Sequence, residues 1–101
     1  TGSWAAAELI ETDVGNVDSL QVAIDPDGNA IAVWHQNSHD IYSNRYDSDT
    51  GLWDIAAVSI DDSDASQADD PQIAIDPDGN AIAVWYQDDG TNDNIYANRF
   101  E

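Results

Sequence analysis

Apolar and polar residues alternate along several short stretches of the chain, and no stretch has helical periodicity. The segment Gln21–Asp25 alternates and is rich in branched residues, while Asn29–Gln36 is apolar at almost every position. Successive side chains of a strand point to opposite faces. The second segment therefore places one apolar set on each face, namely Ala30, Ala32 and Trp34 against Ile31, Val33 and His35. We predict a strand that is covered on both faces.

The four residues between these two strands predict a tight turn. Asp25 can accept a hydrogen bond from the backbone ahead of it, Pro26 presets φ, and Gly28 tolerates the left-handed conformation. This pattern is typical of a type I turn followed by a bulge. The two strands therefore form a hairpin.

Two further kinds of strand follow from the pattern. The segment Asp40–Tyr46 alternates, and the turn at 47–51 leads from it to residues 52–60. Residues 3–11 resemble residues 52–60, with a Trp near the start and branched apolar residues near the end, so we predict a strand in both. Polar stretches at 12–19 and 61–70 are predicted loops.

The chain contains an internal sequence repeat. Residues 21–34 and 72–85 differ only at Val22 and Ile73, which corresponds to a period of 51 residues from Ile24 to Ile75. The repeat predicts equivalent strands at 72–76, 80–87 and 94–100. With the strands at 21–25, 29–36, 40–46 and 52–60 called A, B, C and D, the chain runs D-A-B-C twice. We interpret residues 1–101 as a single unit of two repeats, 1–46 and 47–101.

Four short antiparallel strands in a repeat of about fifty residues are typical of a β-propeller blade. The hairpin around Pro71–Val84 resembles NHL-type propeller repeats, and the whole unit resembles the GNAxAVW…IYAxR(Y/F) repeats of uncharacterised secreted bacterial and archaeal proteins. The placement of Trp34 and Trp85 late in strand B departs from the NHL pattern, as does the longer period. The resemblance implies an all-β fold of two four-stranded antiparallel blades.

Two blades cannot close a ring, because propellers have about four to eight. We therefore expect the chain to form a cyclic homo-oligomer in which residues 3–11 of one copy complete the last blade of its neighbour. A trimer is favoured, and a tetramer or pentamer is the alternative. A fragment of a larger secreted repeat protein is the rival interpretation.

The charge of the chain is extreme. It has 21 acidic residues against two Arg and no Lys, which gives a formal net charge of −19. Nucleic acids and anionic membranes are excluded as partners, because both need a basic surface. The acidity favours a hypersaline or extracellular setting, and calcium binding is the alternative explanation. The chain has no cysteine, so neither disulfides nor thiolate metal sites can form.

Few residues suggest a binding site. Arg45 and Arg99 share a repeat position and can grip a carboxylate or sugar, or else form structural pairs. Trp34 and Trp85 are expected in the core. The oxygen-rich segment 88–94 is a weak calcium candidate through Asp88, Asp89 and Asp93, although it lacks EF-hand spacing. The predicted ligand-binding residues are Trp53, Tyr86, Asp88, Asn92, Arg45 and Arg99.

No catalytic motif or cofactor loop is identified, and the spacing of His35 and His39 is a poor metal signal outside a helix. We expect a non-catalytic module without a cofactor that binds a glycan or a protein partner. A purely structural duplicated blade, natural or engineered, is the alternative.

Overall fold

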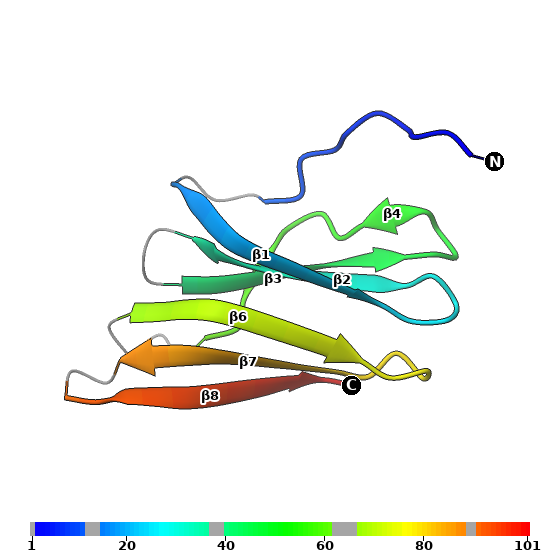
Figure 1. Ribbon diagram of the computed structural model, residues 1–101. Helices are drawn as coiled ribbons and strands as arrows, with labels where there is room; N and C mark the ends of the chain where they lie inside the picture. The colour runs from blue at the N-terminus through cyan, green and yellow to red at the C-terminus, as the bar shows by residue number, and fades with distance from the viewer. Residues whose placement is uncertain (1, 12–14, 37–39, 62–66, 89–90) are drawn as a thin grey trace.

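Two antiparallel sheets lie face to face (Figure 1). The computed structural model describes residues 2–11, 15–36, 40–61, 67–88 and 91–101, and this part of the chain contains no helix. It follows that none of the described residues forms a helix long and apolar enough to cross a membrane. The predicted all-β, antiparallel architecture is confirmed.

The first sheet, called sheet one, is built from the first repeat and the start of the second. Its order is β1-β2-β3-β4, and β5 also pairs with β3. The strands are β1 (Val17–Ile24), β2 (Ala30–Gln36), β3 (Asp40–Asp47), β4 (Leu52–Trp53) and β5 (Val58–Ser59).

Sheet two has three strands in the order β6-β7-β8. They are β6 (Gln67–Ile75), β7 (Ala81–Asp88) and β8 (Asp93–Phe100). Strands A, B and C of both repeats are therefore confirmed. Two sheets do not make a closed propeller, so the ring stays a prediction.

The predicted turn is present in both repeats. The amide of Gly28 donates to the carbonyl of Asp25 at 3.1 Å, and that of Gly79 donates to Asp76 at 3.1 Å. Both glycines have positive φ, 91° and 88°. The carboxylate of Asp76 also accepts the side-chain amide of Asn80, which is the main reason why its pKa lies below the usual value. Local turn chemistry accounts for the whole hairpin connection.

Strands β1 and β6 begin earlier than expected, at Val17 and Gln67, so the predicted loops 12–19 and 61–70 were too long. The reason is a β-bulge at the same repeat position in each strand. Ser19 and Asp70 both have φ of 52°, and the carboxylate of the preceding Asp accepts each of their amides at 2.8 Å. An irregular register breaks the alternation that marks a strand in the sequence.

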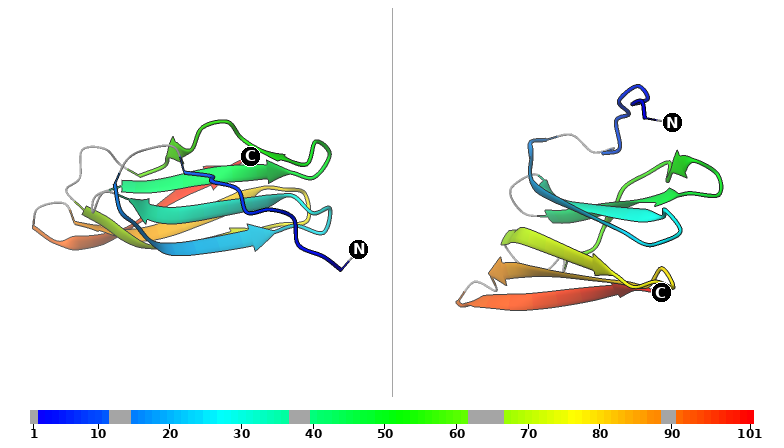
Figure 2. Two further views of the ribbon diagram at one scale, coloured as in Figure 1. Left: turned by 90° about the horizontal axis from the view of Figure 1, so that it is seen from above. Right: turned by 45° about the vertical axis from the view of Figure 1, so that its right-hand side comes forward.

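The prediction of a strand at residues 3–11 was wrong, and the prediction of a strand at residues 52–60 was only partly right. Residues 3–11 make no ladder pairs, and 52–60 contributes only the short β4 and β5. A strand needs an unpaired edge beside it. The N-terminal segment lies instead over the face of sheet one that looks away from sheet two, where the side-chain amide of Asn44 donates to the carbonyl of Ile10 (Figure 1, Figure 2).

Each sheet has two apolar faces, set by the alternation along its central strand. The Ala/Trp face carries Ala30, Ala32 and Trp34 in sheet one and Ala81, Ala83 and Trp85 in sheet two. The Ile/Val face carries Ile31 and Val33 in sheet one and Ile82 and Val84 in sheet two. The buried core joins the Ile/Val face of sheet one to the Ala/Trp face of sheet two.

The two strand-B tryptophans are buried, as predicted. Each indole N–H donates to the side-chain oxygen of the glutamine two residues on, Trp34 to Gln36 at 2.8 Å and Trp85 to Gln87 at 2.7 Å. Each ring therefore keeps its polar atom satisfied while it packs in an apolar layer.

Candidate functional site

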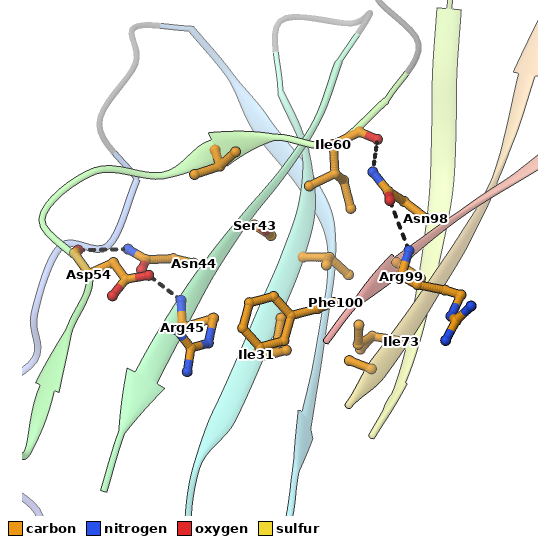
Figure 3. A pocket seen from close by; sticks show the side chains of 14 residues that line it. Ile31, Ser43, Asn44, Arg45, Asp54, Ile60, Ile73, Asn98, Arg99 and Phe100 are labelled. Atoms are coloured by element: carbon orange, nitrogen blue, oxygen red, sulfur yellow. Dashed lines mark hydrogen bonds between the residues drawn. The ribbon is translucent and has the colours of Figure 1, made fainter. Parts of the chain in front are cut away.

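A cavity of about 260 Å³ lies between the two sheets, beside β3 and β8 (Figure 3). Its floor is apolar and comes from both sheets and from the β5 region, with Ile31, Val33, Val58, Ile60, Ile73 and Phe100 among its residues. Four of its polar residues come from equivalent places in the two repeats, namely Asn44 and Arg45 from β3 and Asn98 and Arg99 from β8, and the other two are Ser43 and Asp54.

The two arginines serve the packing of the described chain. The guanidinium carbon of Arg45 lies 4.3 Å from the centre of the Phe100 ring, which is a cation–π contact between the sheets. Arg99 forms an ion pair with Glu101. The structure thus brings both predicted arginines to one cavity.

The two asparagines that precede the arginines were missed by sequence reasoning. The side-chain amide of Asn44 donates to the carbonyl of Ile10 at 2.8 Å, and that of Asn98 donates to the carbonyl of Ile60 at 3.1 Å. Each asparagine oxygen also accepts the amide of the next residue, Arg45 or Arg99. The repeated Asn-Arg pair was the signal in the sequence that could have identified them. In each pair the asparagine holds a neighbouring backbone segment through its carbonyl.

The remaining predicted ligand residues lie apart from this cavity. Trp53 packs on Tyr46 at the β3–β4 edge, with ring centres 5.6 Å apart. Tyr86 and Asp88 lie at the end of β7 on sheet two, and Asn92 directly precedes β8.

The phenol of Tyr86 interacts with an acidic neighbour. Its hydrogen bond to the Asp93 carboxylate, together with that negative charge, raises the pKa of Tyr86 above its usual value. Tyr86 therefore stays a neutral donor at physiological pH.

The described residues contain no group of three His, Asp or Glu side chains that could hold a metal ion. The calcium candidate Asp89 lies outside the described residues, as does His39. His35 lies near Asp69, with 3.6 Å between Nδ1 and Oδ1. The calcium prediction at Asp88, Asp89 and Asp93 is not tested by this geometry.

The lining of the cavity is largely apolar, and it also includes the hydroxyl of Ser43 and the carboxylate of Asp54. An apolar floor can bury apolar side chains, and each rim asparagine holds the backbone carbonyl of a neighbouring segment, at Ile10 or Ile60.

Comparisons with protein-family models, with curated proteins and with solved structures return no match. The function is therefore argued from the geometry of the two sheets.

Proposed function

We propose that this chain is a non-catalytic, self-assembling β-propeller module. Copies stack head to tail through their outer sheet faces and close into a ring, and the loops of the ring bind a glycan or a protein partner. The stacking is argued first, because the other parts depend on it.

The observation that carries the proposal is an interface that the chain already makes with itself. The Ile/Val face of sheet one packs on the Ala/Trp face of sheet two. The outer surfaces of the pair are the Ala/Trp face of sheet one and the Ile/Val face of sheet two. Since the repeats are nearly identical, these outer faces match each other as the inner faces do.

Several residues of the outer faces are more exposed than their counterparts at the same repeat position, whereas Ala30, Ala32 and Trp34 are about as buried as Ala81, Ala83 and Trp85. Ile82 is 51% exposed while its counterpart Ile31 is 5% exposed, and Ile95 is 76% exposed while Ile41 is fully buried. The same difference in exposure is found for two β1 residues on the Ala/Trp face of sheet one. Val22 and Ile24 are exposed, whereas their counterparts Ile73 and Ile75 pack against the core.

Exposed apolar faces of this kind mark interaction surfaces. A second copy is the occupant that fits, because it presents the same side chains as the sheet that covers the inner face. Such a contact is heterologous, so repeated stacking gives either a closed ring or an open filament. The equivalent of the Arg45–Phe100 contact would then place Arg99 of one copy on Tyr46 of the next.

Substitution Ile82→Glu is expected to reduce the assembly to single chains while the circular dichroism spectrum stays that of a folded β protein. A carboxylate on the stacking face would lose its water in the assembly without gaining a partner. Light scattering coupled to size exclusion in ~2 M KCl measures the effect.

The matched control is Ile55→Glu. Ile55 is fully exposed in the irregular stretch between β4 and β5 and lies on neither sheet face. Equal loss of assembly in both variants would mean that charge and not the stacking face controls association.

The ligand-binding part of the proposal rests on the predicted residues Trp53, Tyr86, Asp88, Asn92, Arg45 and Arg99. A glycan array probed with the assembled protein tests it, and a signal that Tyr86→Ala removes would support it. Absence of any glycan or protein ligand would favour the purely structural module.

A longer repeat protein is the second candidate, because further repeats in the same chain would cover the same two faces. In that case the given chain alone stays a single chain in solution.

A further inference from the structure

We propose that the cavity between the sheets is a docking site for the N-terminal segment, residues 3–11, of a second copy. The segment would add to the outer edge of β8 and would insert Trp4 and Leu9 into the cavity. This inference rests on the stacking proposed above and identifies the part of the partner that enters the cavity.

The first argument is a contact that the chain makes twice. Asn98 of sheet two binds the carbonyl of Ile60, which belongs to the segment at the edge of sheet one. Asn44, its counterpart in sheet one, binds the carbonyl of Ile10. Ile10 and Ile60 also correspond in sequence, since each precedes an acidic residue before a polar linker. The N-terminal segment therefore occupies the place of an edge strand from a sheet stacked above sheet one.

The second argument concerns the edge of β8. At the equivalent edge of β3, the carbonyls of Ile41 and Arg45 accept the amides of Ile60 and Asp54 at 2.8 and 2.9 Å. Among the described residues, no strand pairs with the corresponding edge of β8. A segment like 52–60 would complete it through the carbonyls of Ile95 and Arg99.

The third argument concerns the side chains. Trp53 of β4 packs on Tyr46, and Ser59 of β5 pairs with Tyr42. Their counterparts are Trp4, which opens its segment as Trp53 does, and Leu9, which follows from the correspondence of Ile10 with Ile60. The N-terminal segment has one residue fewer between these two positions than the segment 52–60. On β8 they would lie beside Phe100 and Tyr96, on the face that looks toward sheet one and into the cavity.

Trp4 is fully exposed and Leu9 is largely exposed in the single chain, although both are large and apolar. Phe100 lines the cavity, which has an apolar floor and a volume of about 260 Å³ in which these side chains could lie. Burial of the two would stabilise the docked segment through the hydrophobic effect.

The segment must come from another copy. Residues 2–11 lie on the side of sheet one away from sheet two, and the ribbon views agree on this (Figure 1, Figure 2). In a chain that keeps the Asn44–Ile10 contact, sheet one lies between the N-terminal segment and the cavity of the same chain. The segment cannot reach that cavity, because packed sheets are about 10 Å apart. The β8 edge of a neighbour stacked on sheet one lies on the correct side.

The register of the N-terminal segment on β8 of the next copy predicts a specific crosslink between the two copies. Val58 pairs with Ser43, so Glu8 of one copy should pair with Ala97 of the next. Both residues are exposed, and paired positions in a sheet lie at about 5.5 Å between Cα atoms, which suits a disulfide. The native chain has no cysteine to compete.

The experiment mixes a Glu8→Cys chain with an Ala97→Cys chain in ~2 M KCl, and mild oxidation follows. A covalent two-chain product on a non-reducing gel is expected. The matched control replaces the second chain by Ala74→Cys, because Ala74 is also exposed but lies on β6, at the other edge of sheet two. The control mixture should give little product.

Circular dichroism confirms that each variant is folded, and light scattering on the same mixtures separates the two proposals. An oligomer without the specific crosslink, or with equal crosslinking to Ala74→Cys, overturns the docking of the segment but leaves the stacking. A mixture of single chains overturns both.

Discussion

Substitution Val33→Asp is expected to abolish the cooperative fold, whereas Val84→Asp should leave a folded single chain. Val33 is fully buried between the two sheets, and Val84, at the same repeat position, is only half-buried on the outside of sheet two. An unpaired carboxylate in an apolar layer costs several kcal/mol, a large part of the 5–15 kcal/mol that about a hundred residues supply. Urea unfolding followed by circular dichroism measures the difference.

Each variant is the matched control for the other, because the substitution, the strand position and the near neighbours in sequence are the same. Only the face-to-face arrangement of the sheets distinguishes them. The opposite order, with Val84→Asp the more damaging, would contradict this arrangement.

The thermal midpoint is expected to rise by about 5 °C or more between ~0.1 M and ~2 M KCl. The chain carries 21 acidic residues against two Arg and no Lys. Repulsion among these carboxylates acts over about 10 Å at 0.1 M salt and only about 3 Å at 1 M salt. Scanning calorimetry measures the shift.

A chain with exposed Asp27, Asp49 and Asp78 changed to Asn is the matched control, and its midpoint should respond less to salt. Calcium and magnesium at equal ionic strength separate screening from site binding. Equal midpoints at both KCl concentrations would contradict general repulsion, and a rise with calcium alone would favour the calcium interpretation.

The local features of the fold were predictable from the sequence. The hairpin turns follow from Asp25 and Gly28 and their copies, because each residue has a specific task in the turn. Strand B was recognised because it is apolar on both faces. The tryptophans late in that strand are both buried, as expected, although only Trp85 lies between the two sheets.

The features that depend on distant partners were not predictable. The bulges at Ser19 and Asp70 hide the first halves of β1 and β6, because polar residues in an irregular register look like a loop. Residues 3–11 have the composition of a strand, but they pair with no strand edge in the described chain. Alternation also cannot tell which apolar face of sheet one meets sheet two.

The candidate site was predicted in part. The repeated arginines led to the cavity, because the only two cations of the chain occupy one repeat position. Asn44 and Asn98 were missed, since the repeated Asn-Arg pair does not reveal the role of its asparagine until the segment that the asparagine binds is located. The residues near Tyr86 do not join the arginines, because they lie at the opposite end of their strands.

The molar mass of the unmodified chain in ~2 M KCl, from light scattering coupled to size exclusion, is the most direct test of self-assembly. Stacking of the two outer faces predicts a discrete species of about three to five times the 11.0 kDa of one chain. A mass of 11.0 kDa at all concentrations would contradict the assembly and would leave the longer repeat protein as the explanation.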